Sequence, residues 1–297
     1  MNPTTLEAAG TFCWNNARLL ERQRYRFLFQ GGSREPALTA LRAYQNADGG
    51  FGNALEPDIR CPESQPIDQE LGITVLDEIG FEPEIATRVC DFLQTITTEE
   101  GGVPFVLPSV RDYPHAPWWD TEPNPPAAIN PTASIAGLLL KNGFRHPWVE
   151  QATEFCWRKI AEIQTEEVHD LLSVLNFLQY APDRERAQSE FTRFIGAIRA
   201  GTAVDPHATG YVKKPLDWAP TPESLCRSLF SDSVIAAHLE ALAAQQQSDG
   251  GWPIAWPPVS PACELEYRGW VTIGALKTLR AYGVLNSAQG VTPLTPA

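Results

Sequence analysis

The stretch Gln45-Asn46-Ala47-Asp48-Gly49-Gly50-Phe51 closes an apolar segment, and a close copy of it returns as Gln246-Gln247-Ser248-Asp249-Gly250-Gly251-Trp252. A degenerate copy, Glu99-Glu100-Gly101-Gly102-Val103-Pro104-Phe105, lies between them. The acidic residues at 48, 100 and 249 are separated by 52 and 149 residues, and the second interval is close to three units of about 50. Such a period indicates a repeat architecture built from helix pairs, so 297 residues predict about six pairs.

Apolar residues recur at helical spacing along most of the chain, and alternating strand patterns are absent. The predicted helices cover residues 12–29, 37–44, 71–79, 85–96, 132–140, 148–163, 168–180, 187–198, 224–230, 234–244 and 270–282. We therefore expect an all-α fold with one domain over residues 1–285 and a C-terminal tail over residues 286–297. The long connections follow every second helix, so we expect them to gather on one face. They span roughly residues 46–68, 98–128, 201–221 and 248–266.

Composition narrows the function classes. The formal charge is −13 and the isoelectric point about 4.9, with Lys and Arg scattered, which argues against binding to nucleic acid or to an anionic membrane surface. No apolar stretch is long enough to cross a bilayer. The first residues lack the basic and apolar regions of a signal peptide, so we expect a cytoplasmic protein. Six widely spaced cysteines predict reduced thiols, and nothing in the sequence indicates an oligomeric state.

Charged and aromatic side chains are concentrated in the long connections. Carboxylates and imidazoles exchange protons, so we predict five catalytic candidates: Glu56, Asp58, His115, Asp120 and Glu266. Aromatic walls suit sugars and isoprenoid chains with cationic intermediates. The predicted substrate-binding residues are Arg60, Trp118, Trp119, Tyr211, Trp218, Trp252, Trp256, Tyr267 and Arg268. Arg60 also fits an ion pair that pins its own loop, and the Asp-Gly-Gly turns are predicted to be structural.

The two full copies of the turn, Gln45-x-x-Asp48-Gly49-Gly50-Phe51 and Gln246-x-x-Asp249-Gly250-Gly251-Trp252, resemble the QW-type repeats of the squalene/terpenoid cyclase and protein prenyltransferase superfamily. The resemblance implies an α/α toroid that encloses an apolar cavity. Ala128-Ile129-Asn130-Pro131-Thr132-Ala133 is similar to the DxDD-Thr-Ala segment of the cyclases but carries none of its acids. The DDxxD motif and the Asp-x-Cys pair of the prenyltransferase zinc site are also absent from the sequence, so we predict no metal and no cofactor.

Three functions remain open at this point. The leading hypothesis is a terpenoid-cyclase-like enzyme that cyclises or isomerises an apolar, isoprenoid substrate by acid–base chemistry with a nonstandard acid. The second is a carbohydrate-active hydrolase or lyase that uses paired carboxylates. The third is a non-catalytic toroid that binds an apolar ligand or a protein partner. An apolar cavity favours the first, a polar groove with facing carboxylates the second, and a filled cavity would exclude both enzymes.

Overall fold

The computed structural model describes residues 4–285, and these residues form twelve α-helices and three short 3₁₀ helices, without a strand. The all-α prediction is thereby confirmed, and two isolated β-bridges are the only extended pairings in this part of the chain. The α-helices are α1 (Thr5–Asn16), α2 (Leu19–Gln30), α3 (Glu35–Arg42), α4 (Pro66–Ile79), α5 (Pro83–Ile96), α6 (Ile129–Lys141), α7 (Pro147–Glu162), α8 (Val168–Tyr180), α9 (Arg184–Ala200), α10 (Pro215–Trp218), α11 (Asp232–Ala244) and α12 (Pro261–Ala281). The 3₁₀ helices are η1 (Pro108–Asp112), η2 (Pro117–Trp119) and η3 (Arg227–Leu229).

Three predicted helices differ from the structure. The last was predicted over residues 270–282, but α12 begins at Pro261, within the predicted connection 248–266. Residues 12–29 were predicted as one helix, but the chain breaks at Ala17 and Arg18, which are extended with ψ of 163° and 162°. The Arg22 side chain donates to the Ala17 carbonyl at 2.8 Å and so stabilises the break. Residues 224–230 form only the one-turn helix η3. An apolar spacing therefore locates buried positions but does not reveal where the backbone hydrogen bonds stop.

The chain folds into two compact units, each made of discontinuous segments. Unit 1 comprises Met1–Ala37, Val204–Trp256 and Glu264–Ala297, and unit 2 comprises Leu38–Ala203 and Pro257–Cys263. The predicted single domain over residues 1–285 stays a prediction, as does the closed toroid, and the tail predicted at 286–297 lies outside the described residues. Across residues 4–285, no helix combines the length and the apolar character that a membrane span requires.

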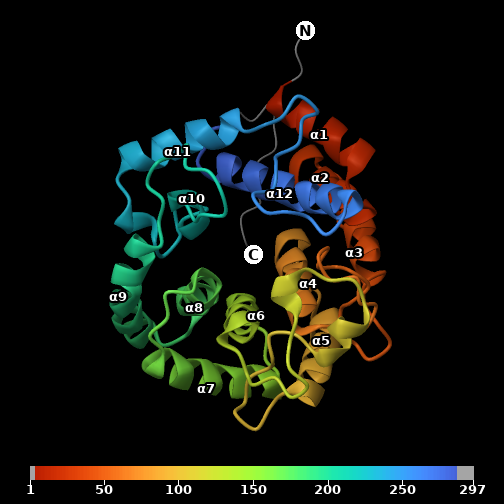
Figure 1. Cartoon of the computed structure of the whole chain (residues 1–297), viewed down its shortest axis with the longest axis vertical. Helices are drawn as coiled ribbons and strands as arrows, with labels where there is room; N and C mark the ends of the chain where they lie inside the picture. The colour runs from red at the N-terminus through yellow and green to blue at the C-terminus, as the bar shows by residue number, and fades with distance from the viewer. Residues whose placement is uncertain (1–3, 286–297) are drawn as a thin grey trace. The chain divides into compact units, whose positions relative to one another are not determined.

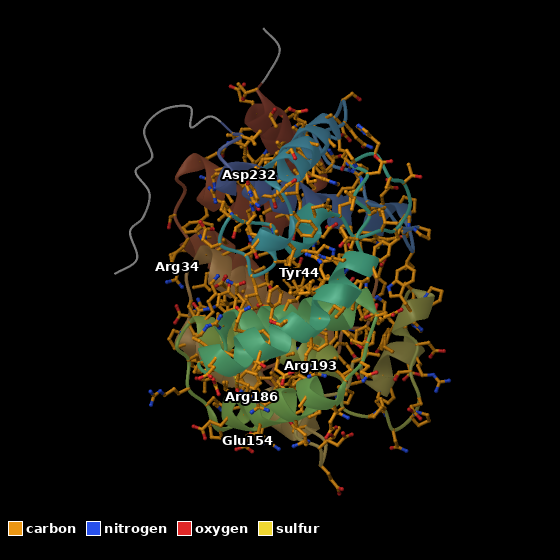
Figure 2. The ribbon with its side chains drawn as sticks, turned by 90° about the vertical axis from the view of Figure 1, so that its left-hand side faces the viewer. Arg34, Tyr44, Glu154, Arg186, Arg193 and Asp232 are labelled. Atoms are coloured by element: carbon orange, nitrogen blue, oxygen red, sulfur yellow. The ribbon has the colours of Figure 1, made fainter. Side chains whose placement is uncertain are left out.

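Within unit 2 the helices pack in two layers (Figure 1). α6 lies between α4 and α8 in the first layer, while α5 and α7 are neighbours in the second. α6 is almost entirely buried, from Ile129 to Leu139 with only Asn130 partly exposed. The second layer presents charged side chains to solvent, including Glu154 on α7 and Arg186 and Arg193 on α9 (Figure 2). The consecutive helices α4 to α8 therefore alternate between the two layers.

The repeated Asp-Gly-Gly turns share one backbone geometry. The first glycine of each copy has a positive φ, with values of 94° at Gly49, 93° at Gly101 and 93° at Gly250. In both full copies the Gln side chain donates to the carbonyl of this glycine, and the Asp carboxylate accepts the N–H of the next one. The distances are 2.8 Å for Gln45–Gly49, 2.9 Å for Gln246–Gly250, 2.9 Å for Gly50–Asp48 and 3.0 Å for Gly251–Asp249. The turns thus have the structural role predicted for them.

Each turn also packs against a helix in the same way. A Cβ on the first glycine would meet one helix residue, and a Cβ on the second would meet the Phe four residues later on that helix. The three helix pairs are Arg88 and Phe92 for Gly49 and Gly50, Gln151 and Phe155 for Gly101 and Gly102, and Ala8 and Phe12 for Gly250 and Gly251. Residues four apart lie on one face of a helix. The two glycines, which have no side chain, therefore let that face pack directly against the backbone of the turn.

The two full turns differ in what holds the Asp carboxylate. Asp48 accepts from the Ser64 hydroxyl at 2.8 Å, whereas Asp249 accepts from the buried Arg268 guanidinium at 2.8 Å. The hydrogen bond from Arg268 is the main cause that lowers the pKa of Asp249 below its ordinary value. Arg268 also donates to the Trp252 carbonyl at 3.1 Å, so it links the turn to the start of α12.

We expect the Asp249–Arg268 pair to make stability depend on acid pH. Because the folded state lowers the pKa of Asp249, the stabilisation is present above the pKa of the unfolded chain and is lost as pH falls through the lower folded value. Asp249 is partly exposed, so solvent screening limits the contribution to about 1 kcal/mol or less. Urea unfolding of the wild type and D249N between neutral and strongly acidic pH measures this contribution. An unchanged pH profile in D249N would contradict it.

Candidate active site

The first two long connections are joined to each other in unit 2. Ile59 and His115 form an antiparallel bridge. The Arg60 N–H donates to the Pro114 carbonyl at 2.9 Å, and the Ala116 N–H donates to the Asp58 carbonyl at 3.0 Å. The structure therefore places Asp58 and His115 on adjoining backbone segments. This agrees, for this pair, with the prediction that the long connections lie close together.

Three carboxyl groups are buried where the first connection enters α4. Asp58 and Asp68 are fully buried, and Glu56 is 5% exposed. The Glu56 N–H donates to Asp68 Oδ1 at 2.6 Å, and the Asp58 N–H donates to Glu56 Oε1 at 3.2 Å. Cys263 Sγ, in the first turn of α12, donates to Asp58 Oδ1 at 2.8 Å. We call Glu56, Asp58, Asp68 and Cys263 the acidic cluster. Buried carboxyl groups need such donors to offset lost hydration.

A fourth carboxyl group, Glu70, leaves α4 on another side. Residues two apart on an α-helix are rotated by about 200°, so Glu70 and Asp68 diverge. Glu70 is bonded to the Ser134 hydroxyl on α6. Ser134 in turn accepts from the Ser173 hydroxyl on α8 at 2.9 Å, and its N–H donates back to Ser173 Oγ at 3.2 Å. We call Glu70, Ser134 and Ser173 the Glu70 chain.

The environment of Glu70 favours its protonated form. Burial of the carboxyl group, only partly offset by the Ser134 hydroxyl, raises the pKa of Glu70 to about 7. Glu70 nevertheless keeps a partly exposed side chain, whereas Ser134 and Ser173 are 3% and 1% exposed. A carboxyl group with a pKa near neutrality suits general acid–base work, because it holds and releases a proton under the same conditions.

The predicted residues of the second connection differ in exposure and in their contacts. His115 Nδ1 lies 2.7 Å from the Tyr113 carbonyl, and its side chain is partly exposed. Trp118 is 45% exposed, whereas Trp119 is buried and stacks on Phe105 with ring centroids 4.9 Å apart. Asp120 is exposed and pairs with Arg111, Oδ1 to Nε at 3.3 Å. The neighbouring Trp118, Trp119 and Asp120 therefore occupy three different environments.

The third and fourth connections meet in unit 1 through aromatic rings. Trp256 contacts Tyr211 and Tyr267 edge to face, with ring centroids 5.8 and 4.9 Å apart. Tyr211 is half exposed and the other two rings are partly exposed. We call these three residues the aromatic cluster. Sequence reasoning predicted all three as substrate-binding, and the structure does bring them together.

Other residues predicted to bind substrate are buried or hydrogen-bonded within the protein. Trp218 and Trp252 are 4% and 1% exposed, and the Trp252 indole donates to the Leu242 carbonyl at 2.8 Å. Arg60 donates to the Pro57 carbonyl at 3.2 Å. Asp249 binds Arg268, and Glu266, two residues earlier on α12, is partly exposed.

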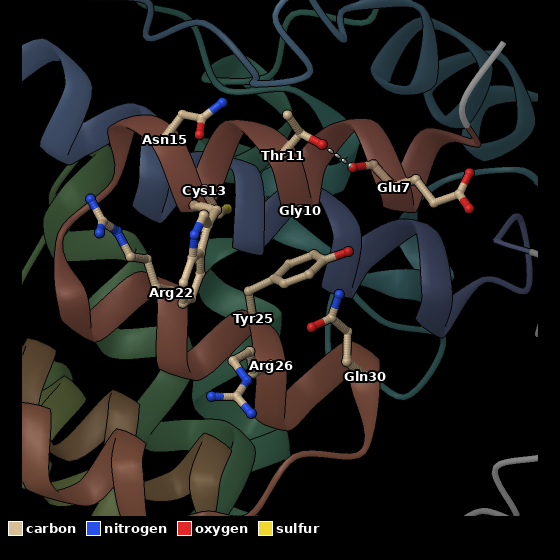
Figure 3. A pocket seen from close by; sticks show the side chains of 10 residues that line it. Glu7, Gly10, Thr11, Cys13, Asn15, Arg22, Tyr25, Arg26 and Gln30 are labelled. Atoms are coloured by element: carbon tan, nitrogen blue, oxygen red, sulfur yellow. Dashed lines mark hydrogen bonds between the residues drawn. The ribbon is translucent and has the colours of Figure 1, made fainter.

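A pocket of about 480 Å³ lies against α1 and α2 in unit 1 (Figure 3). Its polar groups support the two helices: Thr11 Oγ1 donates to the Glu7 carbonyl at 3.0 Å, and the Tyr25 hydroxyl donates to the Leu6 carbonyl at 2.6 Å. Burial raises the pKa of Tyr25 to about 12, so it holds its proton at neutral pH. Burial also raises the pKa of Cys13 to about 12, and the hydrogen bonds to Thr4 lower the pKa of Glu7, so we place the candidate site at α4 instead.

Among residues 4–285, no group of three or more His, Cys, Asp or Glu side chains could hold a metal ion. All six cysteines are buried free thiols. Burial raises the pKa of the Cys13, Cys90 and Cys226 thiols to about 12, which keeps them protonated and poorly nucleophilic.

Comparisons with known proteins inform the fold alone. No protein-family model matches the chain, and no curated protein matches it. A solved structure described as the crystal structure of a protein from Actinoplanes is similar, with a TM-score of 0.56 and 19% sequence identity. The similarity covers 93% of this chain and 88% of that one. At this identity the likeness establishes a shared helical fold, and the description of that protein names no activity.

Proposed function

We propose that this protein is an acid–base enzyme that isomerises or cyclises an apolar, isoprenoid-like substrate with the carboxyl groups of residues 56–70. One observation carries the proposal: Glu56, Asp58, Asp68 and Glu70 fall within this short stretch and are all buried or half-buried. Carboxyl groups are rarely buried unless they are paired, so four in one stretch mark a candidate functional site.

The partners of these groups support the proposal. Each carboxyl group accepts a hydrogen bond from a neutral donor, namely a backbone N–H for Glu56 and Asp68, the Cys263 thiol for Asp58 and the Ser134 hydroxyl for Glu70. Such donors hold a buried carboxyl group in a fixed orientation.

The proposal predicts proton exchange with carbon. We expect the wild type, incubated with farnesol or squalene in D₂O, to form rearranged products that carry deuterium, detected by mass spectrometry. Among E56Q, D58N, D68N and E70Q, at least one is expected to lose activity by about 10²–10⁴-fold, because an amide cannot exchange the proton. E154Q removes an exposed carboxylate on α7 and serves as the control. Absence of deuterated products with every probe would reject the function.

The aromatic cluster favours a second candidate, a carbohydrate-active hydrolase or lyase. Sugars stack on exposed ring faces, and Tyr211 presents a half-exposed ring next to Trp256. Release of reducing ends from soluble oligosaccharides tests this function directly. If Y211A and W256A abolish such release while farnesol and squalene remain unchanged, the carbohydrate function replaces the isoprenoid one. Ligand binding without any turnover would support a non-catalytic scaffold.

A further inference from the structure

We infer that the pocket against α1 and α2 in unit 1 binds an aromatic monocarboxylate. Arg22 and Arg26, which we call the arginine pair, hold the carboxylate, and the ring of Trp14 stacks on the aromatic body. The pocket volume of about 480 Å³ is typical of small-molecule sites, which span roughly 300–1,000 Å³. Its lining differs from the carboxyl groups of residues 56–70, so this inference does not rest on the proposed acid–base function.

One wall of the pocket is a fixed aromatic ring. A Cβ on Gly10 of α1 would lie 2.8 Å from the Tyr25 hydroxyl oxygen and 2.9 Å from Cε1, so the glycine lets the Tyr25 ring lie against α1. The Tyr25 hydroxyl donates to the Leu6 carbonyl at 2.6 Å, and its ring contacts Phe29 with centroids 5.4 Å apart. Because these contacts exist without a ligand, the wall needs no rearrangement to receive one.

The arginine pair lies on one face of α2, because residues four apart on a helix are neighbours. Arg22 donates through Nε to the Ala17 carbonyl at 2.8 Å, and within residues 4–285 its two terminal amino groups have no protein acceptor. Its guanidinium carbon lies 5.9 Å from the centroid of the Trp14 ring. Arg26 is exposed, and in the same part of the chain its side chain makes no hydrogen bond or ion pair. Arg22 is therefore an oriented donor, and Arg26 can adapt to the ligand.

The carboxylates of α1 and α2 do not neutralise the arginine pair. These helices carry two of them, Glu7 and Glu21. Glu7 accepts from the Thr4 N–H at 2.8 Å and from the Thr4 hydroxyl at 3.0 Å, while Glu21 pairs with Arg18 at 2.8 Å and with Arg24 at 3.6 Å. The chain has 36 acidic and 23 basic residues, so carboxylates are in excess, yet none pairs here. Two like charges four residues apart destabilise a helix, and a bound anion relieves this repulsion.

The remaining lining selects the class of anion. A guanidinium group matches a carboxylate through two parallel hydrogen bonds. Trp14 is 55% exposed at the pocket, so its ring offers a free face to a flat apolar body. Figure 3 shows Arg22 toward one end of the pocket and Glu7 toward the other. The Glu7 carboxylate repels a second anionic group at that end, so a ligand with a single carboxylate fits better than a dicarboxylate.

An NMR titration of the ¹⁵N-labelled full chain tests the site without relying on turnover. We expect 2-naphthoate to shift the indole N–H resonance of Trp14, assigned by its disappearance in W14F, with a dissociation constant of about 1 mM or tighter. 2-Naphthamide lacks the charge, and acetate and inorganic phosphate lack the rings, so each should bind at least about 10-fold more weakly. Equal binding of the amide would overturn the role of the arginine pair. Equal binding of acetate or phosphate, or no shift with 2-naphthoate, would refute the aromatic ligand.

Matched variants locate the binding energy. R26Q removes an exposed charge without a protein partner, so the fold should persist while the affinity for 2-naphthoate falls by about 10-fold and that for 2-naphthamide stays unchanged. R186Q is the control, because Arg186 also covers a Trp ring, that of Trp157 at 4.4 Å, but does not line the pocket. W14A should weaken both naphthyl ligands alike. Unchanged 2-naphthoate affinity in R26Q, or an equal loss in R186Q, would overturn the assignment.

Discussion

W252A is expected to lower the free energy of unfolding by about 3–5 kcal/mol, because Trp→Ala in a well-packed core removes a large apolar surface and leaves a cavity. Trp252 is 1% exposed and packs in a core cluster with Phe12, Ile235 and Leu276. Its indole also donates to the Leu242 carbonyl at 2.8 Å, which the substitution leaves without that donor. Urea unfolding followed by circular dichroism measures the change.

W118A provides the matched control. Trp118 is 45% exposed, and its replacement is expected to change the free energy of unfolding by about 0.5 kcal/mol or less. Similar losses of unfolding free energy in W252A and W118A would show that the burial of Trp252 does not account for the effect. Reduced ligand affinity in W118A with unchanged stability would instead support the predicted binding role of Trp118.

G72A is expected to destabilise the protein by about 3 kcal/mol through overpacking. A Cβ on Gly72 of α4 would lie 2.2 Å from Phe51 Cδ2 and 2.3 Å from Cε2. The Phe51 ring cannot retreat easily, because Phe51 is fully buried and its N–H is bonded to Gln69 Oε1 at 2.8 Å. Thermal and urea unfolding measure the loss.

G196A in α9 is the control for G72A. A Cβ on the exposed Gly196 would meet nothing within 4 Å, so the substitution is expected to stabilise the helix by about 0.5–1 kcal/mol. If both variants behaved alike, helix propensity rather than contact with Phe51 would govern the effect at Gly72.

The helices were largely predictable because each buries one apolar face. Residues 85–96 and 148–163 were predicted from spacing, and α5 and α7 begin only one or two residues earlier, at Pro83 and Pro147. The break at Ala17 and Arg18 was missed, because the apolar spacing continues across it and only backbone geometry records the interruption. The spacing of apolar residues shows which side of a segment is buried. A break in the helix changes the direction of the chain but leaves the same side buried, so the spacing does not reveal it.

The candidate site was predictable only in part. Glu56 and Asp58 stood out because three charges in five loop residues have no helical spacing to explain them. Glu70 had no such signal, since its importance depends on Ser134, which lies 64 residues away on α6. Trp118 and Trp119 were indistinguishable as neighbours, yet one is 45% exposed and the other 7%. Contacts between distant segments set these differences, and composition does not record them.

The close packing of each glycine pair against a helix has an evolutionary consequence. The third turn has lost the Gln and Asp of the full copies, yet Gly101 keeps its φ of 93° and Gly102 still approaches Phe155. The feature common to all three copies is therefore a glycine pair together with a Phe on the partner helix, rather than the turn alone. Among descendants of one ancestral repeat, we expect the glycine pair and this Phe to be gained, lost or enlarged together, even where every other residue of the motif has drifted beyond recognition.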